Sequence, residues 1–91
     1  MSTVFVEDAN ADEVLVRVCQ IIARVQGLPE ERVRGESSFL ELGIESLDAI
    51  NLLFALEDAF GIKIPMEEGQ YRTVEEAVAG VRRHLAAGDA P

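Results

Sequence analysis

The sequence predicts an all-α fold, a small three- to four-helix bundle with a long loop between helices one and two. Its 91 residues suit one small domain with a thin core. Apolar residues make up 48% of the chain, but only 5% of residues are aromatic, so the core must be aliphatic. Because strands favour aromatic and β-branched residues, this composition favours helices. Three stretches also repeat apolar residues at helical spacing.

The first predicted helix begins at Asn10, because Asn10 and Glu13 resemble a capping box. Residues 1–9 have too few apolar positions for a strand and are expected to form a loose N-terminal arm. Gly27, followed by Pro29, is expected to end the helix. The predicted apolar face consists of Val14, Val18, Ile21, Ile22 and Val25.

A long connection from Leu28 to Leu42 follows this helix. Loops beyond about 12 residues are uncommon in compact domains and are usually functional or held by their own packing. Val33, Phe39 and Leu42 are the expected anchors of the loop, which leads to a turn at Gly43.

The second predicted helix runs from about Ser46 to Phe60, with Gly61 as its left-handed C-cap and residues 62–65 extended. At roughly 100° per residue, its two sides differ in character. The predicted core side carries Ala49, Leu52, Leu53, Leu56 and Phe60. The opposite side carries Leu47, Asn51, Phe54 and Asp58, with Ile50 at the margin. Leu47 and Phe54 should therefore be exposed apolar residues.

The last predicted helix opens with a capping box formed by Thr73 and Glu76, after a segment 67–71 that could hold one helical turn. Its apolar positions are Val74, Ala77, Val78, Val81 and Leu85. Residues 88–91 are expected to fray, so one domain is expected over residues 10–87.

A net charge of −9, from 17 acidic and 8 basic residues, disfavours nucleic acid and anionic membranes as partners. A basic protein partner fits this charge, although solubility alone also accounts for an acidic surface. The single cysteine, Cys19, cannot form an internal disulfide and lies beside the first apolar stripe, which predicts a structural thiol. With no membrane-spanning run and no signal-peptide pattern, a cytoplasmic monomer is expected.

Catalytic and metal-binding patterns are weak in this sequence. His84 is the only histidine, so a catalytic pair would require it to meet Ser46 or Cys19 across the fold. A solvated position near a helix C-terminus explains His84 better. The acidic pairs at 57–58 and 67–68 lack the concave, apolar surroundings of paired catalytic carboxylates. We therefore predict no catalytic residue, no metal site and no enzyme activity.

Ser46 has two interpretations. A serine at a helix start is a common N-cap. Alternatively, a phosphodiester on its hydroxyl would lie beside unpaired N–H groups at the positive end of the helix. No basic residue occurs between Arg34 and Lys63, where the acids are Glu36, Glu41, Glu45, Asp48, Glu57 and Asp58. This one-signed face, with Leu47 and Phe54 among the acids, is typical of a docking surface.

This region resembles the acyl carrier protein family. The matching residues are Leu42-Gly43-Ile44-Glu45-Ser46-Leu47-Asp48, Leu56-Glu57-Asp58-Ala59-Phe60 and Ile64-Pro65. The resemblance extends from about Val14 to Leu85 and implies that Ser46 carries 4′-phosphopantetheine, added from coenzyme A by a phosphopantetheinyl transferase. The thiol of that group would hold an acyl chain as a thioester, in fatty-acid, polyketide or related secondary-metabolite synthesis.

The resemblance also implies partner enzymes with basic docking surfaces and a cleft for the acyl chain. The expected partner-binding residues are Glu45, Leu47, Asp48, Asn51, Phe54, Glu57 and Asp58. The expected cleft residues are Leu53, Leu56, Ile62 and Tyr71. Tyr71 stands where the family usually has a smaller aliphatic residue, so it would shorten or polarise the cleft.

Two alternatives stay open on the sequence. An aminoacyl or peptidyl carrier would use the same attachment chemistry, but such carriers more often have Gly-Gly before the serine, where this chain has Gly43-Ile44-Glu45. An unmodified helical module could instead regulate a partner through the second helix.

Overall fold

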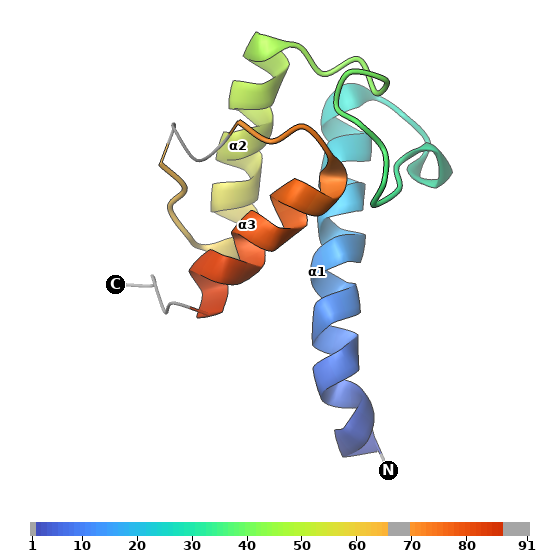
Figure 1. The fold of residues 1–91 in the computed structure, drawn as a ribbon, viewed down its shortest axis with the longest axis vertical. Coiled ribbons are helices and arrows are strands. Elements are labelled where there is room, and N and C mark those ends of the chain that lie inside the picture. Colours follow the sequence, from blue (N-terminus) through green and yellow to red (C-terminus); the bar gives the residue numbers. More distant parts are fainter. Residues whose placement is uncertain (1, 66–69, 87–91) are drawn as a thin grey trace.

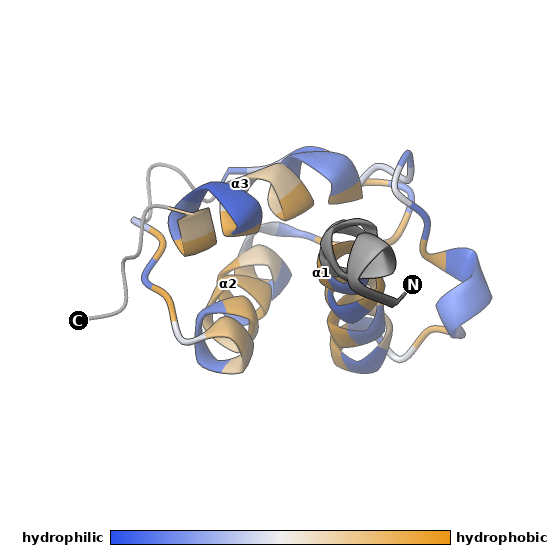
Figure 2. Ribbon diagram, turned by 90° about the horizontal axis from the view of Figure 1, so that it is seen from below, coloured by the Kyte–Doolittle hydropathy of each residue, from blue (hydrophilic) through white to orange (hydrophobic). Residues whose placement is uncertain are grey.

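The computed structural model describes residues 2–65 and 70–86, with side chains from residue 13 onward, and contains three α-helices and one short 3-10 helix (Figure 1). The elements are α1 (Ser2–Gln26), η1 (Glu30–Arg32), α2 (Ser46–Phe60) and α3 (Val74–Ala86). α1 and α2 lie side by side, and α3 crosses over both (Figures 1 and 2). The predicted all-α fold with a long first loop is confirmed.

α1 begins earlier than predicted. It starts at Ser2 rather than Asn10, so residues 2–9 are helical and do not form the expected loose arm. No Gly or Pro precedes Gly27, and nothing therefore interrupts the backbone hydrogen bonding of the helix. The expected turn over 67–71 falls largely outside the described residues, although Gln70 and Tyr71 are not helical. Residues 88–91 also lie outside them.

Two glycines end the helices as predicted. Gly27 and Gly61 have φ of 68° and 65°, in the left-handed region where glycine has no steric cost. The Leu28 N–H donates to the Ala23 carbonyl at 2.8 Å, and the Ile62 N–H donates to the Glu57 carbonyl at 3.2 Å. These bonds satisfy carbonyl groups that the helix ends leave unpaired.

An aliphatic core joins the three helices and the loop (Figure 2). The predicted loop anchors Val33, Phe39 and Leu42 are all buried, which confirms them. The predicted core positions Val25 and Leu85 are exposed instead, because each lies in the last turn of its helix. The buried apolar residues are Val18, Ile21, Ile22, Ala23, Val33, Phe39, Leu42, Ile44, Leu52, Leu53, Leu56, Ile62, Ile64, Val74, Ala77, Val78 and Val81.

The long loop is fastened to the start of α3. The Phe39 N–H donates to the Arg72 carbonyl at 2.8 Å, and Ser38 and Thr73 form an isolated antiparallel bridge. Thr73 Oγ1 accepts the Glu76 N–H at 3.2 Å, as expected of the cap of α3. The Glu76 carboxylate accepts the Arg72 N–H at 2.8 Å, one residue before the position that a capping box would use. This pairing brings residues 70–72 near the loop.

Leu56→Ala is expected to destabilise the protein by about 2–5 kcal/mol, because Leu56 is only 1% exposed and its loss leaves a cavity in the core. Urea denaturation followed by circular dichroism would measure this free energy of unfolding. Phe54→Ala is the control on the same helix, since Phe54 is 55% exposed. Equal losses for the two variants would contradict the described core.

Candidate functional site

Ser46 is the first residue of α2, and Glu45 is the N-cap. The Glu45 N–H donates to Asp48 Oδ2 at 3.2 Å, and the Glu45 carbonyl accepts the Ala49 N–H at 2.8 Å. The interpretation of Ser46 as the N-cap is therefore wrong, because capping is supplied one residue earlier. The Ser46 hydroxyl is left for another role.

The turn before Ser46 is held from both sides. Gly43 has φ of 77°, which a residue with a side chain adopts only with strain. The Ile44 N–H donates to the Phe39 carbonyl at 2.9 Å. From α1, Gln26 Nε2 donates to the carbonyl oxygens of Leu42 at 3.4 Å and Gly43 at 3.2 Å. α1 thus helps to fix the backbone that presents Ser46.

The Ser46 side chain is exposed, and no group in residues 13–65 or 70–86 forms a hydrogen bond with its Oγ. It stands at the N-terminus of α2, where unpaired N–H groups and the helix dipole favour an anion. An attached phosphodiester would therefore be both accessible and electrostatically stabilised at this position.

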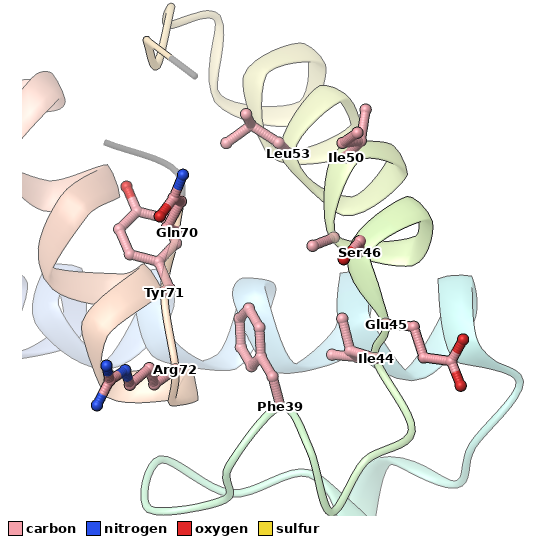
Figure 3. A pocket seen from close by; sticks show the side chains of 10 residues that line it. Phe39, Ile44, Glu45, Ser46, Ile50, Leu53, Gln70, Tyr71 and Arg72 are labelled. Atoms are coloured by element: carbon pink, nitrogen blue, oxygen red, sulfur yellow. The ribbon is translucent and has the colours of Figure 1, made fainter. Parts of the chain in front are cut away.

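A cavity of about 810 Å³ opens beside Ser46 (Figure 3). One wall comes from α2, another from the loop around Phe39 and Ile44, and the third from residues 70–72. The lining residues are Phe39, Ile44, Glu45, Ser46, Ala49, Ile50, Leu53, Gln70, Tyr71 and Arg72. The apolar Phe39, Ile44 and Leu53 are buried, whereas the polar lining residues are exposed except for the half-buried Tyr71. The interior is thus apolar, with a polar rim.

Two of the four expected cleft residues line this cavity. Leu53 and Tyr71 do so, whereas Leu56 and Ile62 lie in the core and are absent from the lining. Ile62 follows the Gly61 turn, which directs the chain back into the core. The sequence interpretation missed Phe39, Ile44, Ala49, Ile50, Gln70 and Arg72 as lining residues. For Phe39 and Ile44, their places on either side of the Gly43 turn were an available signal.

Cys19 and His84 are not among the residues that line the cavity with Ser46. Cys19 is half-buried, and burial raises the pKa of its thiol, with a smaller contribution from Glu30. A protonated thiol is a poor nucleophile. Among the described residues there is no cluster of three or more potential metal ligands, and none of their helices is long and apolar enough to cross a membrane.

The outer face of α2, which we define as Glu45, Leu47, Asp48, Asn51, Phe54 and Asp58, is largely exposed. Leu47 is 69% exposed and Phe54 is 55% exposed, as the helical wheel predicts. Two of the expected partner-binding residues, Asp48 and Glu57, are half-buried. Asp48 bonds within the N-terminal cap of α2, whereas Glu57 Oε2 accepts the Ile64 N–H at 2.7 Å. One oxygen of Glu57 is therefore committed to the segment after α2.

Glu57→Ala is expected to lower the free energy of unfolding by about 1–3 kcal/mol, because the part-buried Ile64 N–H loses a charged acceptor. Glu57→Gln keeps an acceptor oxygen and should lose less. Urea denaturation would measure both variants. Asp58→Ala is the neighbouring control, expected within about 0.5 kcal/mol of the original protein because Asp58 is exposed. A loss for Asp58→Ala as large as that for Glu57→Ala would contradict the structural role of Glu57.

Two comparisons with known proteins gave matches over most of this chain. Residues 16–81 match the family model described as the phosphopantetheine attachment site. The chain is also similar to the crystal structure of an acyl carrier protein from Thermotoga maritima, with 30% identity and a TM-score of 0.76. That similarity covers 87% of this chain and 94% of the other. The three-helix arrangement is that of the small helical carrier fold.

Proposed function

Because the chain belongs to the phosphopantetheine attachment site family, we propose that it is an acyl carrier protein whose 4′-phosphopantetheine is attached to Ser46. Domains of this family are sites of covalent attachment of that group. The observation that carries the assignment to Ser46 is its exposed hydroxyl at the N-terminus of α2, beside the cavity. When bound, the group supplies a thiol that holds an acyl chain as a thioester.

The residues around Ser46 fit an attached phosphodiester. Gly43 and Gln26 hold the preceding turn, and the Asp48 carboxylate is engaged with the Glu45 N–H. The first turn of α2 provides backbone N–H groups towards the phosphate. The chain itself supplies binding and presentation, while partner enzymes supply the catalytic groups.

The outer face of α2 is the proposed docking surface for the transferase and for acyl-loading and acyl-processing enzymes. Its exposed acids would steer basic surfaces, and Leu47 and Phe54 would provide the apolar contacts. We propose that these enzymes belong to fatty-acid, polyketide or related synthesis. A cytoplasmic monomer is part of the proposal, consistent with the unpaired thiol of Cys19.

The cavity is the proposed shelter for the attached chain. Its buried wall of Phe39, Ile44 and Leu53 suits methylene groups, because burying each one stabilises the complex by about 0.8 kcal/mol. Ser46 is exposed and lines the cavity, so an arm attached there could place its end inside.

Incubation with coenzyme A and a broad-specificity phosphopantetheinyl transferase tests the proposal. The intact mass should increase by one phosphopantetheine group, located by peptide mapping on the fragment that contains Ser46. No increase, or an increase on another residue, would reject the assignment. The mass of cargo on protein isolated from its host would separate an acyl carrier from an aminoacyl or peptidyl carrier.

A further inference from the structure

Tyr71 is seated in a notch that Gly80 leaves in α3. Gly80 is buried, and a Cβ at its position would lie 3.0 Å from Tyr71 Cε1 and only 2.7 Å from Cζ, closer than a Cβ approaches other atoms. The absence of a side chain at Gly80 therefore allows the ring to lie against the helix. In Figure 3, the Tyr71 ring is directed towards α3, across the cavity from Leu53.

The two ends of the Tyr71 side chain have different surroundings. Its ring lines the cavity, whereas its hydroxyl oxygen is buried beside Gly80. A buried hydroxyl cannot contact a chain that lies in the cavity. Of the two effects expected from the sequence, shortening or polarising the cleft, the geometry supports shortening.

We propose that Tyr71, held in the Gly80 notch, is the specificity-determining wall that limits the length of the apolar acyl chain the cavity accepts. This inference rests on the proposed function, since it concerns the cargo of Ser46. The exposed Gln70 and Arg72 stand on the rim, while the interior is apolar, so the accepted cargo is an apolar chain rather than a charged one.

Three substitutions separate the contributions of the ring, the hydroxyl and the notch. Tyr71→Val removes the ring and opens the cavity towards α3. Tyr71→Phe keeps the ring and removes only the buried hydroxyl. Gly80→Ala occupies the notch and forces the ring away from α3.

The test uses the full chain with Ser46→Cys in a Cys19→Ala background, so that no transferase is needed. Thiols with an amide spacer and n-alkyl tails from ethyl to dodecyl are attached to position 46 by a disulfide. Methyl NMR shifts of Ile50 and Leu53 are recorded for each tail. In the parent, the shift changes should grow with tail length and then level off at the length where the wall is reached.

The tail length at which the shift changes level off should be longer in Tyr71→Val than in the parent and should be unchanged in Tyr71→Phe. In Gly80→Ala, this tail length should differ from that of the parent. The proposal is overturned if no tail shifts these methyl groups in the parent, or if Tyr71→Val levels off where the parent does. It is also overturned if Tyr71→Phe behaves like Tyr71→Val. If Tyr71→Val does not fold, Gly80→Ala provides the test: shift changes that level off at the same tail length as in the parent would reject Tyr71 as the limiting wall. Failure of the proposed function would appear separately, as the absence of enzymatic modification at Ser46.

Discussion

Ser46→Ala is expected to abolish covalent modification by the transferase completely, because no other described hydroxyl is equally available. Ser37 is buried, and its Oγ accepts the Arg34 N–H at 3.0 Å. Ser38 Oγ accepts the Glu41 N–H at 3.1 Å, and Thr73 Oγ1 accepts the Glu76 N–H at 3.2 Å. Each of these hydroxyls holds a turn or a helix cap, whereas that of Ser46 holds neither.

Intact-mass spectrometry after incubation with coenzyme A measures the modified fraction of each variant. Ser38→Ala is the matched control: it should lose about 0.5–1.5 kcal/mol of stability with the turn hydrogen bond but keep full modification. Thermal unfolding of Ser46→Ala should match that of the original protein, because its hydroxyl has no partner within residues 13–65 and 70–86. A modified Ser46→Ala protein would contradict the assignment.

The features that the sequence predicted well are set by local chemistry. Both bounds of α2, Ser46 and Phe60, were predicted because a periodic apolar stripe meets a glycine cap at Gly61. The loop anchors followed from isolated apolar residues in a polar stretch. The N-terminus of α1 was not predicted, because a capping pattern at Asn10 permits a helix start without requiring one. The helical wheel likewise placed Leu85 on the core side of the last helix. A wheel does not show that Leu85 lies in the last turn of α3, where it is exposed.

The cavity depends on contacts that are distant in sequence. Residues 70–72 line the cavity beside Ser46 because the loop pairs with the chain before α3, as in the hydrogen bond from the Phe39 N–H to the Arg72 carbonyl, and neither residue type indicates that pairing. The commitment of Glu57 to the Ile64 N–H is similar, since an acidic residue next to Asp58 looks like another surface charge. The packing of Tyr71 against Gly80 also could not be predicted from the sequence, because a glycine inside a helix has several explanations.

Leu47→Ser is expected to lower the kcat/KM of the transferase roughly tenfold or more, with no comparable loss of stability. Leu47 directly follows Ser46 and is 69% exposed, so an enzyme that reaches the Ser46 hydroxyl must cover the surface beside it. Fully burying a leucine stabilises a complex by about 1.5–3 kcal/mol, and 1.4 kcal/mol corresponds to a factor of ten. The acids of the outer face of α2 would form the rim of this interface. Asp58→Asn should therefore mainly reduce the rate of association with the transferase and the dependence of that rate on salt.

Initial rates of coenzyme A consumption at several carrier concentrations measure this effect and divide it between KM and kcat. The loss should appear mainly in KM, because Leu47 contributes binding area and no reacting atom. Val16→Ser is the control, since Val16 is 49% exposed on α1 and is not part of the outer face of α2. If Leu47→Ser and Val16→Ser have equal kcat/KM, α2 does not provide the apolar contact. If Leu47→Ser lowers kcat at unchanged KM, Leu47 acts on the presentation of Ser46 rather than on docking.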